Sequence, residues 1–120
     1  MIYTSYFAHY RGSNGVSIAR WSPKWFAGPN CIALAPSVDL LNWWKSLSKE
    51  EQHKVSNIAI YLDRYKKETL FPLENQVDEL YSKLDGKVLL CYENLSKDFC
   101  HRSIVALWFQ KHGYECKELD

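Results

Sequence analysis

The sequence predicts a single α/β domain, residues 1–120, in which flanking helices form a three-layer structure with a mainly parallel β-sheet. The chain has 120 residues, 47% of them hydrophobic, which suits one domain with one packed core. Short apolar runs alternate with longer amphipathic segments, as they do in α/β proteins. Residues 88–118 have the pattern strand, helix, strand, which forms a right-handed crossover between parallel strands.

The first third of the chain predicts three short strands. Residues 2–8 are rich in β-branched and aromatic side chains and predict the first strand, and residues 16–20 predict the second. Residues 31–34 predict a third, buried strand that ends before Ala35 and Pro36.

The middle third predicts three helices, over residues 37–44, 48–69 and 72–84. Ser37 is placed to cap the first helix, and Ser48 begins the S-x-x-E pattern of a capping box at the second. The third helix has proline in its first turn and ends at an Asp-Gly pair.

The rest of the fold is organised around residues 87–102, KVLLCYENLSKDFCHR. The apolar run at residues 88–91 is typical of a strand buried on both faces. A polar loop follows, and Asp98 is placed to cap a helix that extends to about His112, before a last strand at residues 114–118. Ligands of open parallel sheets usually bind where a strand ends and its helix begins, so we expect a site here.

Composition excludes several classes of protein. The 15 Lys and Arg residues balance 14 Asp and Glu residues, so we expect no strong non-specific binding to nucleic acid. No apolar run approaches the roughly 20 residues that span a bilayer, and the first residues lack the pattern of a secretory signal. We therefore expect a cytoplasmic protein with no membrane contact. Its four cysteines include no CxxC pair, so we expect free thiols.

Aromatic residues make up 15% of the chain, more than a small domain buries easily, so some are expected to line a pocket or an interface. Arg20, Trp21, Lys24 and Trp25 combine cations with flat rings. One interpretation is that a cation holds phosphate while a Trp stacks on a base; the commoner alternative is a loop that clamps the sheet edge. Arg20 is the better candidate of the two cations because it directly follows a strand.

The start of the last helix predicts an anion site. Unpaired backbone N–H groups and the helix dipole favour an anion there, and would lower the pKa of the Cys100 thiol. Arg102 could hold a carboxylate or phosphate through two parallel hydrogen bonds. Glu93 and His101 are the candidate acid and base, while Tyr92 alternates with its neighbour across the strand.

Three functional interpretations compete for these residues. The first is a pocket that binds an anionic, nucleotide-like metabolite and acts on it, and the second is the same pocket without chemistry. The third is a metal or thiol site built on Cys91, Cys100 and His101. It is the weakest, because adjacent residues on a helix point roughly 100° apart. A structural alternative is that Arg102 pairs with Glu93 and links loop to helix, with Cys100 buried.

The blocks LLCYE, at residues 89–93, and FCHR, at residues 99–102, resemble the LLCxE…CHR signature of a bacterial, archaeal and phage family identified as domain of unknown function 488. The stretches TSYFA, SIARWSPKWF and LAP are similar to shorter variants in the same family, so the resemblance covers most of the chain. It implies a compact α/β domain with shared polar residues at the carboxyl edge of the sheet. In this sequence these are Ser5, Arg20, Cys91, Glu93, Cys100, His101 and Arg102.

We therefore expect binding of a small anionic, nucleotide-derived ligand, with or without enzymatic processing. The candidate catalytic residues are Glu93, Cys100 and His101. The candidate ligand-binding residues are Ser5, Arg20, Trp21, Trp25, Tyr92 and Arg102. We assign no metal and no cofactor. The alternative is a non-enzymatic interaction or ligand-sequestering protein that uses an exposed aromatic surface.

Overall fold

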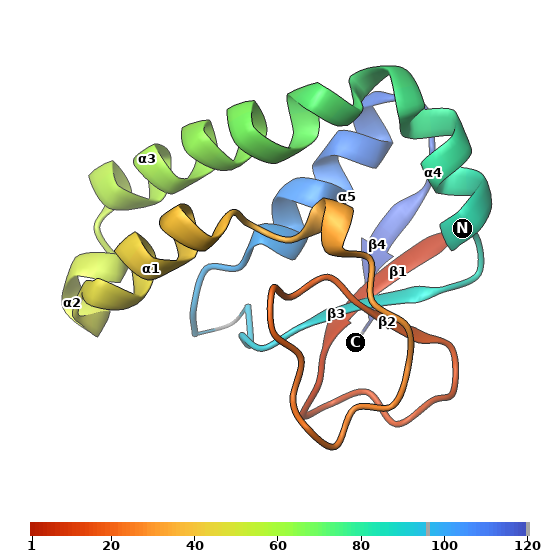
Figure 1. Ribbon diagram of the computed structural model, residues 1–120, viewed down its shortest axis with the longest axis horizontal. Helices are drawn as coiled ribbons and strands as arrows, with labels where there is room; N and C mark the ends of the chain where they lie inside the picture. The colour runs from red at the N-terminus through yellow and green to blue at the C-terminus, as the bar shows by residue number, and fades with distance from the viewer. Residues whose placement is uncertain (96, 120) are drawn as a thin grey trace.

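A computed structural model of the chain describes residues 1–95 and 97–119 (Figure 1). Within these residues a four-stranded sheet has the order β2-β3-β1-β4. The strands are β1 (Ile2–Tyr6), β2 (Gly15–Ser17), β3 (Val88–Cys91) and β4 (Cys116–Glu118). Every pairing is parallel, which confirms the predicted α/β class.

Strand β3 lies inside the sheet, between β2 and β1. All four of its residues are buried, as its continuous apolar run predicts. Leu89 and Cys91 pack in the main core on the helical side of the sheet, while Val88 and Leu90 pack in a second cluster on the other side. Parallel pairing brings the carboxyl ends of β2 and β3 to the same edge.

Helices cover one face of the sheet (Figure 1). They are α1 (Val38–Ser46), α2 (Lys49–Gln52), α3 (Val55–Tyr65), the π-helical turn η2 (Lys66–Leu70), the 3₁₀ segment η3 (Phe71–Gln76), α4 (Val77–Leu84) and α5 (His101–Lys111). Ser37 caps α1 as predicted, since its hydroxyl accepts a hydrogen bond from the Leu40 N–H at 3.1 Å. No helix within the described ranges is both long and apolar enough to cross a bilayer.

The predicted helix over residues 48–69 is wrong in its bounds. Ser48 does accept a hydrogen bond from the Glu51 N–H, but the Glu51 carboxylate bonds to Lys54 and Asn57 instead of closing a capping box. The helix stops at α2, Lys54 takes extended backbone as the next N-cap, and α3 begins at Val55. From there the chain stays helical through η2 and η3 into α4, with no break before Pro72.

The opposite face of the sheet is covered by loops. Its core cluster contains Phe7, Ala19, Val88 and Leu90, with partly buried neighbours from strands and loops of the described chain. The loops after β1 and β2 thus supply the third layer (Figure 1).

The strand predicted at residues 31–34 is wrong. Cys31 donates its N–H to the Ser17 carbonyl, and the chain then turns into the 3₁₀ helix η1 (Ile32–Leu34). Only Leu34 of that helix is buried. A short apolar run does not by itself distinguish a strand from a turn that inserts one side chain into the core.

Candidate functional site

A small cavity of about 60 Å³ lies where β3 ends and α5 begins. Its walls come from the segment after β2, from α1, from the loop after β3 and from the start of α5. Six of the predicted site residues line it, namely Arg20, Trp21, Tyr92, Glu93, Cys100 and His101. They meet because β2 and β3 are parallel neighbours that end at the same edge.

One wall of the cavity is cationic. The Arg20 Nε–H donates to the Pro36 carbonyl at 3.0 Å, which holds the guanidinium in place. Within the described residues no partner is found for its two terminal nitrogens. Lys45, from α1, lines the same cavity and lies over the Trp21 ring at 5.3 Å. The cavity therefore presents two cationic side chains to any ligand that enters it.

Glu93 lies on the cavity wall directly after β3 and is partly buried. Burial raises the pKa of its carboxyl above the ordinary value, although the Arg102 guanidinium acts in the opposite direction. A carboxyl group with a raised pKa holds its proton to a higher pH than an ordinary carboxyl group does, which suits proton transfer. Glu93 is therefore a suitable acid–base group for this cavity.

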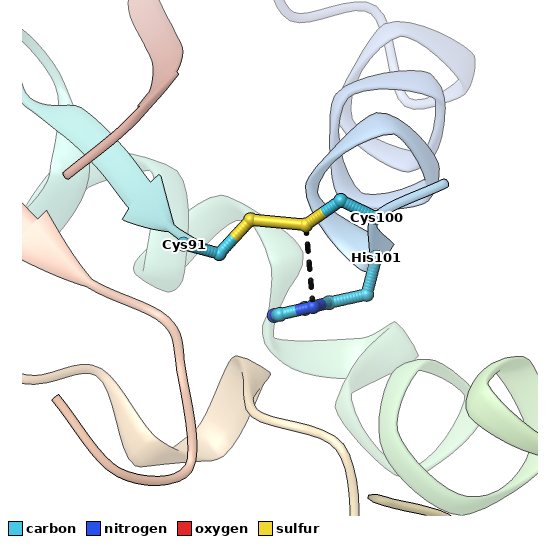
Figure 2. Close-up of side chains that lie close together, drawn as sticks. All are labelled: Cys91, Cys100 and His101. Carbon is cyan, nitrogen blue, oxygen red and sulfur yellow. Dashed lines mark hydrogen bonds between the residues drawn. A yellow bond between two sulfur atoms is a disulfide. The ribbon is translucent and has the colours of Figure 1, made fainter. Parts of the chain in front are cut away.

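His101 is buried at the first position of α5. Its Nε2 lies 2.8 Å from the Ile18 carbonyl oxygen, which can only accept, so Nε2 carries the hydrogen and donates. Burial lowers the pKa of the ring to about 4. The ring is therefore neutral at neutral pH, and its Nδ1 lone pair points toward the Cys100 sulfur at 3.8 Å (Figure 2).

Cys91 and Cys100 form a disulfide (Figure 2). The expectation of free thiols is therefore wrong for this pair, although Cys31 and Cys116 are free. A strand end and a helix start, nine residues apart, bring the two sulfurs together, and no CxxC spacing signals it. In this disulfide state Cys100 has no thiol to act as a nucleophile.

The start of α5 also differs from the prediction. Cys100 is the N-cap, with extended backbone at φ −143° and ψ 145°, so it lies outside the first helical turn. Asp98, the predicted cap, instead bonds through its carboxylate to His53 and Lys49, at 3.1 and 3.2 Å. The predicted lowering of the pKa of the Cys100 thiol assumed that Cys100 lies in the first turn of the helix, and the structure does not meet that assumption.

Arg102 does not line the cavity. Its side chain is fully buried, and its Nε and Nη2 donate to the two carboxylate oxygens of Glu118 at 2.9 and 2.8 Å. Its Nη1 donates to the Glu93 carbonyl oxygen at 2.5 Å and to the Cys91 sulfur at 3.0 Å. All three guanidinium nitrogens are used, so the expected grip on a ligand is contradicted. The structure agrees better with the alternative in which Arg102 links the loop to the helix. Its carboxylate partner, however, is Glu118 on β4, and Glu93 contributes only its backbone carbonyl.

Two further predicted residues lie elsewhere. Ser5 is buried on the loop-covered face, opposite Leu90, and its hydroxyl has no hydrogen-bond partner among the described residues. Trp25 is 65% exposed and lines a separate, open depression with Phe7 and Arg11. Ser5 lies away from the cavity because side chains alternate between the two faces of a strand, and Ser5 and Cys91 face opposite sides of the sheet.

Sequence reasoning missed Lys45 and Glu118. Lys45 lies on the exposed side of α1, and nothing in its local sequence distinguishes it from any other surface lysine. Glu118 carried a weak signal, because a carboxylate in a strand of a parallel sheet needs a partner.

A family model described as the active DUF488-N3 subclade matches residues 10–113. That range includes β2, β3, α5 and every residue named above as lining the cavity. No curated protein and no solved structure matches the chain. Since the family match covers most of the sequence and agrees with the LLCYE and FCHR blocks, the chain belongs to the active DUF488-N3 subclade of the DUF488 family.

Proposed function

We propose that the protein binds a small anionic ligand, derived from a nucleotide, in the cavity at the carboxyl end of β3. The observation that carries the proposal is the state of Arg20. Its Nε is anchored on Pro36, while its two terminal nitrogens have no partner among the described residues. A guanidinium fixed in this way presents a fork of donors that fits phosphate or carboxylate oxygens.

The surrounding groups favour the same ligand. Lys45 adds a second positive charge, and the N-terminus of α5 begins at the cavity wall. Backbone N–H groups in a first helical turn favour anions. Glu93 opposes an anion only when ionised, and burial raises the pKa of its carboxyl. When protonated, it can donate a hydrogen bond to the ligand.

The size of the cavity limits what it can enclose. A volume of about 60 Å³ is far below the ~300–1,000 Å³ typical of sites for whole small molecules. It can therefore enclose only a single small group, such as a phosphate. The rest of the ligand would lie at the rim, where Trp21 and Tyr92 are each about half exposed. The Tyr92 hydroxyl donates to the Trp21 carbonyl at 2.7 Å, which links the two aromatic residues that could stack on a base.

Glu93 is the residue best placed for chemistry on such a ligand, because it combines a raised pKa with a position on the cavity wall. A proton-transfer role predicts that Glu93→Gln keeps ligand binding and loses any turnover. A binding-only function predicts no turnover in the wild type.

Calorimetric titration of the oxidised protein with inorganic phosphate and with AMP tests the proposal. Arg20→Gln should weaken binding by about tenfold or more, because a charge-assisted hydrogen bond contributes about 1.5–3 kcal/mol. The matched control is Lys24→Gln, which removes one charge from an exposed residue of the same segment and should change affinity less than twofold. Equal affinities in the two variants would contradict the proposal, as would no binding by the wild type; either result would favour an aromatic interaction surface.

A further inference from the structure

Beside the cationic wall of the cavity lies a second group of residues, whose chemistry anion binding does not use. We propose that in the reduced protein the Cys91 and Cys100 sulfurs and His101 Nδ1, which lie close together (Figure 2), bind a zinc ion. The fourth position of this ion would open into the cavity that all three residues line. This proposal does not depend on the anionic ligand.

The spacing of the donor atoms supports it. One ligand atom from each of the three residues lies within 4.8 Å of the other two, and Cys100 Sγ is 3.8 Å from His101 Nδ1. Zn–S distances of about 2.3 Å and Zn–N distances of about 2.0–2.1 Å place tetrahedral ligand atoms roughly 3.5–3.8 Å apart. The Cα atoms of the two cysteines are 7.5 Å apart, which leaves the sulfurs room to separate around an ion.

The backbone at the start of α5 removes the geometric objection to adjacent ligands. Cys100 and His101 would point about 100° apart if both were helical. Cys100 is instead the extended N-cap, so its side chain turns back toward the His101 ring (Figure 2). Neighbours in sequence can therefore share one ion here.

The hydrogen bonds of His101 leave the correct nitrogen for a metal. Because Nε2 donates to the Ile18 carbonyl, the lone pair lies on Nδ1, which faces the sulfurs. Metal-binding histidines usually hold their second nitrogen in this way, on a carbonyl or carboxylate. The ring is thus oriented before any ion binds.

Charge and access also suit a divalent cation. Two thiolates neutralise Zn²⁺, and the Arg102 guanidinium, 3.0 Å from the Cys91 sulfur, stabilises the thiolate form. All three ligands are buried, yet all three line the cavity of about 60 Å³. Three protein ligands with one open position are the pattern of exchangeable or catalytic zinc sites.

Reduction must come first. A dithiol reductant transfers two electrons to the Cys91–Cys100 bond, which breaks, while the reductant becomes a disulfide and the protein gains two thiols. Each thiol then loses its proton as zinc binds, so two protons are released per ion. The oxidised protein has no thiolate to offer at this position and should not bind the ion.

Cobalt serves as the spectroscopic probe. The protein is reduced with dithiothreitol, desalted without oxygen and titrated with Co²⁺ and then Zn²⁺. We expect one Co²⁺ per chain, with a sulfur-to-cobalt charge-transfer band and the visible bands of a tetrahedral ion, and we expect Zn²⁺ to remove both. The oxidised protein should show neither band.

Four variants decide whether these three residues are the ligands. Cys91→Ser and Cys100→Ser should lose the charge-transfer intensity of one thiolate each, and His101→Gln should bind Co²⁺ at least tenfold more weakly while keeping both thiols. Cys31→Ser is the matched control, because it removes a free thiol outside the cluster and should bind like the wild type. Circular dichroism reports folding, and His101→Gln decides the matter if a cysteine variant unfolds. No Co²⁺ bound by folded, reduced wild type, or unchanged binding in these variants, would overturn the proposal.

Discussion

Arg102→Met should destabilise the oxidised protein by about 3 kcal/mol. The guanidinium is fully buried and donates to Glu118, to the Glu93 carbonyl and to the Cys91 sulfur. Methionine keeps much of the buried volume, so the loss of these polar contacts, rather than a cavity, determines the cost.

The magnitude follows from what each partner is left with. Breaking a buried ion pair from one side costs about 3–5 kcal/mol, because the other charge stays unpaired. The Glu118 side chain is 32% exposed, so water can hydrate its carboxylate after Arg102 is lost, and we expect the lower end of that range. Glu118→Gln leaves the buried guanidinium without its counter-charge, so its cost should be at least as large. The double variant should cost at least 1 kcal/mol less than the sum of the two.

Urea unfolding followed by tryptophan fluorescence measures these differences. Lys83→Met is the control, since its ion pair with Glu79 is exposed on both sides and should be worth less than about 0.5 kcal/mol. Suppose instead that the free energy of unfolding of Arg102→Met lies within 1 kcal/mol of the wild-type value and that the variant no longer binds phosphate. The guanidinium would then serve a ligand, and the assignment of Arg102 to the fold would be refuted.

Three further predictions concern stability. Reducing the metal-free protein breaks the disulfide between two cysteines nine residues apart and should lower the free energy of unfolding by about 2–3 kcal/mol. Thermal melts of the reduced protein with and without Zn²⁺ should show that the ion restores the lost stability. Tyr65→Phe should cost about 1–2 kcal/mol in urea, because the buried Leu34 carbonyl loses its 2.5 Å hydrogen bond; a cost near zero would mean that water replaces the hydroxyl. Although partial burial opposes it, hydrogen bonds from Ser37 and Arg64 hold the pKa of Glu68 below its ordinary value. The unfolded chain then binds more protons in acid, so this stabilisation is complete above about pH 4.5 and is lost as pH falls, and Glu68→Gln should flatten that part of the pH–stability curve.

Local signals in the sequence predicted much of the fold. The apolar run of β3 and the cap at Ser37 depend on neighbouring residues alone, and both are found where the pattern places them. The strand predicted at residues 31–34 is wrong because the structure of this segment depends on a contact outside it, the hydrogen bond from the Cys31 N–H to the Ser17 carbonyl. The predicted helix over residues 48–69 failed for a local reason instead, since Lys54 adopts extended backbone as the N-cap of α3 and so interrupts the helix after α2.

The candidate site was predictable where it follows from topology. The sequence placed Arg20 and Glu93 each directly after a strand, the family resemblance implied that they share the carboxyl edge of the sheet, and both line the cavity. The partner of Arg102 was not predictable, because it depends on which face Glu118 of β4 presents. The disulfide depended on the start of α5, where moving the cap from Asp98 to Cys100 turns the sulfur toward Cys91.

The most direct test of the site is a phosphate titration of the isotopically labelled, oxidised protein, followed by two-dimensional NMR. We expect the largest amide shifts at Trp21, Glu93 and His101, which surround the cavity, with the Arg20 side-chain signals moving in step. Shifts centred on Arg11 and Phe26, which line the open depression on the loop-covered face, would contradict the assignment and place anion binding on the other side of the sheet.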